Sequence, residues 1–164
     1  MVNEFAVYSE YSDQGADLQP GANVRKFTHI DSEQGDSIQL TPETGVINLK
    51  PGLYHITASA AAGLDGSGAQ LAHNNDAYCQ LSYASPSAQE EGPISVGSHS
   101  VPDMIPSLVD TFLRVKESAS IVLEFLLDQQ DNQDSKVQPV QVESHTGLQV
   151  FSRISILKME EAAA

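Results

Sequence analysis

Residues 40–57, LTPETGVINLKPGLYHIT, decide the fold that the sequence predicts, because they contain two short strands and a strong turn signal. Residues 46–49 form an apolar strand, and residues 53–57 follow with the aromatic and β-branched residues typical of strands. Pro51 and Gly52 stand between the two. A type II turn takes Pro at its first central position and Gly at its second, where φ is positive. The stretch therefore predicts a hairpin closed by a type II turn, with Gly52 in the left-handed region.

Strand signals continue along the rest of the chain, and turn residues interrupt them roughly every eight to twelve residues. This spacing is typical of sandwiches and barrels, and 8 Pro and 11 Gly in 164 residues supply the turns. The sequence predicts one all-β domain over residues 1–164, with about ten strands and a frayed tail at 160–164. Segments 108–115 and 120–127 are expected to pair as a second hairpin, and 94–99 is expected at a sheet edge. The expected strands cover residues 5–11, 24–30, 37–40, 46–49, 53–62, 77–84, 94–99, 108–115, 120–127, 137–143 and 147–159.

The chain is strongly acidic, with 22 Asp and Glu against 8 Lys and Arg and a formal net charge of −14. Such a surface repels nucleic-acid phosphates and anionic membranes, so we expect neither nucleic acid nor membrane insertion. Cys79 is the one cysteine, which excludes an intrachain disulfide, and we interpret it as a small buried apolar residue. The N-terminus lacks a signal-peptide pattern, and no segment has the length of a membrane span.

Three segments carry a common signature in the same order along the chain. In the opening stretch the signature positions are Thr44, Gly45, Gly52, Tyr54 and Ile56. The other two segments are residues 110–125, DTFLRVKESASIVLEF, and residues 151–157, FSRISIL. Together they resemble the C1q-like domains, the jelly rolls of the C1q and tumour necrosis factor superfamily. Two positions depart from the family pattern, since Arg153 replaces the usual Gly after Phe-Ser and Ile47 stands where an aromatic is common.

The resemblance implies a two-sheet antiparallel jelly-roll sandwich that assembles as a homotrimer, in an extracellular or particle-surface setting. Residues 120–127 favour assembly, because their apolar side chains point to both faces and a monomeric sandwich would leave one face wet. Aromatic residues from each subunit would then meet near the three-fold axis, and the candidates are Tyr54, Phe112 and Phe151. The alternative is that all three are ordinary core aromatics.

Polar residues next to the expected strand 77–84 are candidates for binding a glycan or a protein ligand. Amide, imidazole and carboxylate groups can bond hydroxyls, and tyrosine rings can stack on sugars. The candidates are His73, Asn74, Asn75, Asp76, Tyr78 and Tyr83.

A second candidate is the acidic segment that follows the strand 120–127. Asp128, Asp131 and Asp134 offer three carboxylates with amides between them, and oxygen-rich loops suit Ca²⁺. The spacing is not that of an EF-hand, and a solvated loop is the simpler interpretation. No other cofactor is expected.

Catalytic motifs are missing from the sequence. The five histidines form no H-x-H or H-E-x-x-H pattern, and no nucleophile elbow or phosphate-binding glycine loop occurs. The sequence therefore predicts a non-enzymatic binding or structural module. The alternatives are a lectin on the same fold, a trimerising tip of a spore-surface or virion fibre and, less favoured, a metal-dependent jelly-roll enzyme.

Overall fold

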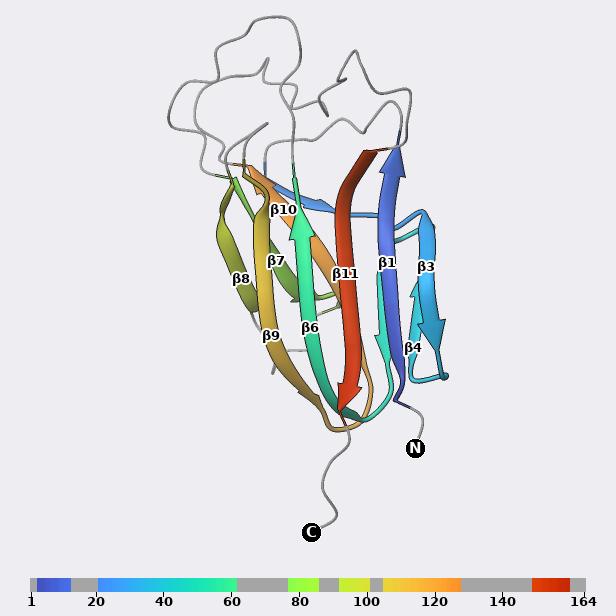
Figure 1. The fold of residues 1–164 in the computed structure, drawn as a ribbon. Coiled ribbons are helices and arrows are strands. Elements are labelled where there is room, and N and C mark those ends of the chain that lie inside the picture. Colours follow the sequence, from blue (N-terminus) through green and yellow to red (C-terminus); the bar gives the residue numbers. More distant parts are fainter. Residues whose placement is uncertain are drawn as a thin grey trace, which may run out of the picture.

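The computed structural model describes residues 3–12, 21–61, 77–85, 92–100, 105–127 and 149–159. Within these ranges the chain forms two antiparallel sheets, which Figure 1 shows as two layers. The five-stranded sheet has the order β3-β1-β11-β6-β9, and the six-stranded sheet has the order β4-β5-β10-β7-β8 with β2 paired to β10. The strands are β1 (Phe5–Ser12), β2 (Gly21–Val24), β3 (His29–Gln34), β4 (Ile38–Thr41), β5 (Val46–Leu49), β6 (Gly52–Ala60), β7 (Ala77–Tyr83), β8 (Pro93–Ser100), β9 (Ser107–Val115), β10 (Ala119–Leu127) and β11 (Gln149–Met159).

The hydrophobic core lies between the two sheets and takes every second side chain of the strands. On β6 the buried residues are Tyr54, Ile56, Ala58 and Ala60, and on β11 they include Ile154 and Ile156. The six-stranded sheet contributes Ile47 and Leu49 from β5, Cys79 and Leu81 from β7, and Ile121, Leu123 and Phe125 from β10. Burial raises the pKa of the Cys79 thiol, in agreement with its interpretation as a buried apolar residue.

The all-β fold, the two-sheet arrangement and most of the predicted strands are confirmed. Segments 5–11, 77–84 and 108–115 match β1, β7 and β9 to within one or two residues, and segment 94–99 lies in β8 at the edge of its sheet. The predicted strand at 137–143 lies outside the described residues.

Both predicted hairpins are wrong, although their strands exist. β5 pairs with β4 and β10, whereas β6 pairs with β11 and β9 in the other sheet. Likewise β9 and β10 belong to different sheets. The Pro51-Gly52 segment is thus a corner where the chain crosses from one sheet to the other, and the Tyr54 hydroxyl donates to the Lys50 carbonyl across that corner at 2.7 Å.

The predicted strand at 24–30 is also wrong, because the chain leaves β2 at Val24 and enters β3 at His29. Between them Phe27 is fully buried, and Arg25 is only 4% exposed. The Arg25 guanidinium donates to both carboxylate oxygens of Glu10 on β1, at 2.9 and 2.7 Å. Ser152 on β11 donates to the same carboxylate at 2.7 Å. An ion pair with all its oxygens bonded can be buried, and here it holds the crossing segment against the five-stranded sheet.

The glycine with positive φ in the deciding stretch is Gly45, at φ 74°, and not Gly52. Its N–H donates to the Thr41 carbonyl at 2.9 Å, which closes the turn between β4 and β5. A Cβ at Gly45 would overlap the Arg25 carbonyl oxygen. At Gly52 a Cβ would instead lie 2.9 Å from Lys158 Cε, the far part of a flexible side chain.

We expect Gly45→Ala to lower the free energy of unfolding by about 1–3 kcal/mol or more, because it combines left-handed strain with backbone overlap. Two control variants separate these causes. Gly92→Ala keeps the strain at φ 107° with no atom within 4 Å, and Gly52→Ala keeps the close approach without positive φ. Urea denaturation should rank Gly45→Ala as the most damaging of the three. Equal losses for all three would contradict the overlap with Arg25.

Candidate functional site

The side of the five-stranded sheet that faces away from the core forms a continuous surface, here called the outer face. The strand register aligns its side chains in rows that run across β1, β11, β6 and β9. The rows are Ser9, Arg153, Ser59 and Leu108; then Val7, Ser155, Thr57 and Asp110; then Phe5, Leu157, His55 and Phe112; and finally Met159, Leu53 and Arg114.

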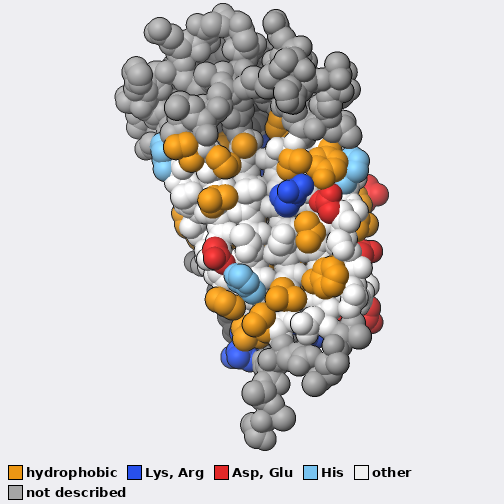
Figure 2. Space-filling view, in the orientation of Figure 1, with side chains coloured by type: hydrophobic (Ala, Val, Ile, Leu, Met, Phe, Trp, Pro, Cys, Tyr) orange, Lys and Arg blue, Asp and Glu red, His pale blue; other side chains and the backbone are white. Residues whose placement is uncertain are grey.

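The outer face exposes several large apolar side chains. Phe112 is 62% exposed, and its ring stacks on His55 with centroids 4.7 Å apart and planes inclined by 17°. Leu108 and Met159 are exposed as well. Figure 2 shows hydrophobic side chains scattered over this side of the molecule, with few charged side chains between them. A surface of this kind is suited to contact with another protein.

Among the described residues the charges on the outer face balance, in contrast to the acidic chain as a whole. Arg114 and Arg153 point outward together with Asp110 and Asp31, whereas the whole chain carries −14. His55 Nε2 lies 2.6 Å from Asp110 Oδ1, next to the exposed ring of Phe112. A face with no net charge does not repel a second copy of itself, which the rest of an acidic surface would do.

Polar contacts surround Arg153, in a group here called the Arg153 cluster (Ser9, Tyr11, Asp31 and Arg153). The Arg153 Nε–H donates to Ser9 Oγ at 2.9 Å, and its Nη2 lies 3.4 Å from Tyr11 Oη. The hydroxyls of Ser9 and Tyr11 both donate to Asp31, and these bonds, with the charge of Arg153, lower the pKa of the Asp31 carboxyl. His29 packs its ring against Tyr11 with centroids 4.5 Å apart. The one sequence signal for this cluster is the departure at Arg153.

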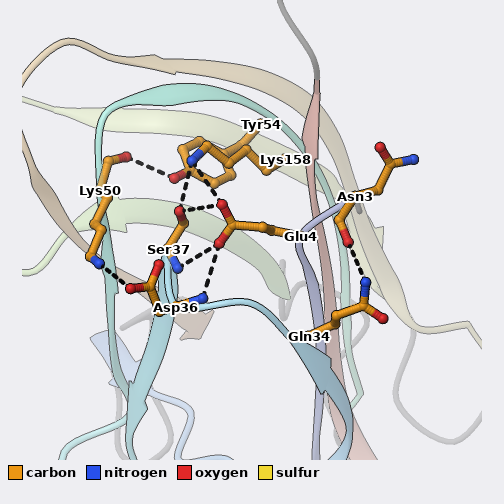
Figure 3. A network of polar contacts seen from close by, with 8 residues as sticks. All are labelled: Asn3, Glu4, Gln34, Asp36, Ser37, Lys50, Tyr54 and Lys158. Carbon is orange, nitrogen blue, oxygen red and sulfur yellow. Dashed lines mark hydrogen bonds and ion pairs between the residues drawn. The ribbon is translucent and has the colours of Figure 1, made fainter. Parts of the chain in front are cut away.

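A second polar network surrounds Glu4, as Figure 3 shows. Its carboxylate accepts bonds from the Ser37 N–H and hydroxyl, both at 2.8 Å, from the Asp36 N–H at 3.0 Å and from Lys158 Nζ at 3.1 Å. The hydrogen bonds from the Ser37 hydroxyl, from Lys158 and from the two N–H groups lower the pKa of Glu4 to about 2. Because these donors occupy both carboxylate oxygens, the network joins the start of β1, the β3–β4 turn and the end of β11 without offering a binding site.

The aromatics predicted at an interface occupy different positions. Tyr54 is 0% exposed and lies inside the sandwich, the position of a core aromatic, so its ring has no surface to offer a partner. Phe151 is buried at 8% exposure, and Phe112 is the exposed one of the three.

The predicted ligand and metal residues fall largely outside the described residues: these are His73, Asn74, Asn75, Asp76, Asp128, Asp131 and Asp134. Tyr78 and Tyr83 lie half-buried on β7, with Tyr83 packed against the core. In the register of β7 and β10, Ala77 is the partner of Leu127. Asp76 precedes Ala77 and Asp128 follows Leu127 in the sequence, so both predicted segments adjoin the same end of the six-stranded sheet.

Within the described part of the chain, no three His, Cys, Asp or Glu side chains are grouped to hold a metal ion. The same part contains no helix of sufficient length and apolarity to cross a bilayer.

The Glu4 network predicts a loss of stability in acid. A carboxyl whose pKa is about 2 in the folded chain, against an ordinary 4.5, stabilises the fold above that ordinary value, and the contribution disappears as pH falls towards 2. We expect the melting temperature of the wild type to fall between about pH 5 and pH 2, and Glu4→Gln to be less stable at neutral pH with a shallower fall. Glu43→Gln, an exposed carboxylate in the β4–β5 turn, is the control. Equal slopes for Glu4→Gln and the wild type would contradict the assignment.

Solved structures share this fold, although no protein-family model matches the chain and no curated protein matches its sequence. The crystal structure of murine APRIL at pH 8.0 matches with a TM-score of 0.58 and 4% identity, over 96% of this chain and 100% of the other. The globular domain of zebrafish complement 1qA protein matches with a TM-score of 0.50 and 13% identity, over 99% of this chain and 100% of the other. The chain therefore has the two-sheet antiparallel jelly-roll fold of C1q and tumour necrosis factor domains.

Proposed function

We propose that this chain is a non-enzymatic binding or structural module that assembles as a homotrimer through its outer face. The observation that carries the proposal is Phe112, a ring that is 62% exposed and held in place by stacking on His55. Phe5 and Leu157 extend the same row as His55 and Phe112. Burying one large apolar side chain contributes about 1.5–3 kcal/mol, and each copy in a closed ring would bury this row.

The balance of charge on the outer face supports self-association. The chain as a whole carries a net charge of −14, so contacts through acidic parts of its surface would be opposed by repulsion. The number of copies rests on the resemblance to C1q-like and tumour necrosis factor domains. A three-fold ring would bring three copies of any ligand site to one assembly, so that weak single contacts add up through effective concentration.

We expect light scattering on a sizing column to give a mass near three chains for the wild type. Phe112→Asp should shift the protein to monomer at low micromolar concentration, because a carboxylate would replace the exposed ring. Val24→Asp is the matched control, since Val24 is 43% exposed but lies on β2 in the six-stranded sheet. A wild-type monomer, or a Phe112→Asp trimer as stable as the wild type, would contradict the proposal.

Ligand binding is proposed for the end of the six-stranded sheet marked by Ala77 and Leu127, which both predicted segments adjoin in the sequence. Asp128 adjoins Leu127, whose register partner Ala77 directly follows the His73–Asp76 segment. Glycan, protein and Ca²⁺ ligands are the chemical classes that these side chains suit.

For Ca²⁺ we expect a rise in melting temperature on adding the ion, and loss of this rise when Asp128, Asp131 and Asp134 are all changed to Asn. The free-energy gain from a bound ion grows with its concentration relative to the dissociation constant, so a titration gives the affinity. Mg²⁺ at the same concentration is the control for ionic strength. A rise that persists in the triple variant would place the ion elsewhere.

A further inference from the structure

Arg153 is a charged residue on the central strand of the face that the proposed trimer would bury. It lies on β11, the middle strand of the five-stranded sheet, and its side chain is 47% exposed. Its bonds to Ser9 and Tyr11 use two of the five N–H donors of a guanidinium, counted over the described residues. The distance from Arg153 Nε to the nearest Asp31 oxygen is 4.0 Å, and that carboxylate already accepts bonds from two hydroxyls. Three of its N–H groups therefore have no hydrogen-bond partner among the described residues.

Arg153 is ion-paired with Asp31 only at 4.0 Å, so a guanidinium taken out of water by a neighbouring subunit is stabilised by a second carboxylate. Two described carboxylates are on the outer face, Asp31 and Asp110. Asp31 belongs to the Arg153 cluster itself. Asp110 on β9 has a 70% exposed side chain, and His55 bonds one of its oxygens, so Oδ2 is available within the described structure.

Arg153 and Asp110 cannot pair inside one chain. β6 lies between their strands, and Asp110 is two residues further along β9 than Leu108, which is level with Arg153. With ordinary strand spacing and rise, their Cα atoms are about 12 Å apart. The positive group thus lies on the central strand and the acceptor on the edge strand β9, about 7 Å apart along the strand direction.

We infer that Arg153 of one copy pairs with Asp110 of the next copy around the ring, an inference that rests on the proposed trimer. A closed ring uses heterologous contacts, in which one half of a face meets the other half of its neighbour. Rotation about an axis along the strands keeps residues at their own height, so β11 of one copy meets β9 of the next with Arg153 level with Leu108. The arginine side chain then spans the two residues, about 7 Å, to Asp110. The contacts of Arg153 with Ser9 and Tyr11 hold its guanidinium in place for that contact.

The first test is a disulfide that can form only between copies. In the double variant Arg153→Cys/Leu108→Cys, the two positions are level in the register. A bond inside one chain is excluded, because two strand spacings of about 10 Å separate their Cα atoms and disulfides need about 4–7 Å. We expect mild oxidation to convert most of the protein into a covalent species of three chains on a non-reducing denaturing gel. Cys79 is buried and is present in every variant.

Three controls make the result specific. Lys26→Cys/Leu108→Cys, with the first thiol on the exposed segment between β2 and β3, should stay uncrosslinked. Each single variant should also stay uncrosslinked, and a covalent dimer of Arg153→Cys alone would place the Arg153 side chains next to one another and overturn the pairing. A wild-type trimer whose double variant does not crosslink overturns this inference and leaves the proposed function standing. A wild-type monomer overturns both.

A double-mutant cycle tests the ion pair itself. Arg153→Ala and Asp110→Ala should each raise the concentration for half-dissociation of the trimer at least tenfold. The double variant should have a half-dissociation concentration no higher than that of the single variant with the larger effect. If the two effects multiply instead, the residues act independently and the pair does not exist. Unchanged melting of each variant at high concentration confirms that folding is intact.

Discussion

The alternation of side chains on β6 and β11 is the constraint on which the rest of the structure depends. Both strands lie inside the five-stranded sheet, where neighbours on both sides fix their register. Once Tyr54 and Ile56 point into the core, His55 must point to the outer face, and the register places Phe112 beside it. The core that stabilises the sandwich and the surface available to a partner are therefore set by the same register, and a slip of one residue would exchange them.

The described ion pairs of this acidic chain lie in three places: in the interior, where β1 starts and β11 ends, and on the outer face. The buried pair of Arg25 and Glu10 is fully bonded and ties a crossing segment to β1. The Glu4 network holds the start of β1 to the end of β11 with a carboxyl whose pKa is about 2. On the outer face two arginines balance two aspartates. The excess negative charge is thus carried elsewhere, where it favours solubility, and the outer face stays compatible with a second copy.

An assembly through the outer face would leave the strand ends at Ala77 and Leu127 free to present ligand-binding segments. This division is economical for a binding module, because the residues that hold copies together differ from those that would contact a ligand. The candidate interface and the candidate ligand segments can be varied independently by mutation.

The sequence by itself determined where the strands lie and which side chains alternate, because both depend on local residue preferences and a period of two. Segments 77–84, 108–115 and 120–127 could be located in this way, and so could the resemblance to C1q-like domains. The sequence could not decide which strands pair, because alternation looks the same in a hairpin and in a strand that crosses to the other sheet. Residues 46–57 are the example, since their two strands belong to different sheets. Only the tertiary structure placed Tyr54 in the core with its hydroxyl on Lys50, and moved the positive φ from Gly52 to Gly45. Only the tertiary structure brought Glu4 to Lys158 and Ser9 to Arg153, because such contacts join residues far apart in the sequence, and no local pattern records them.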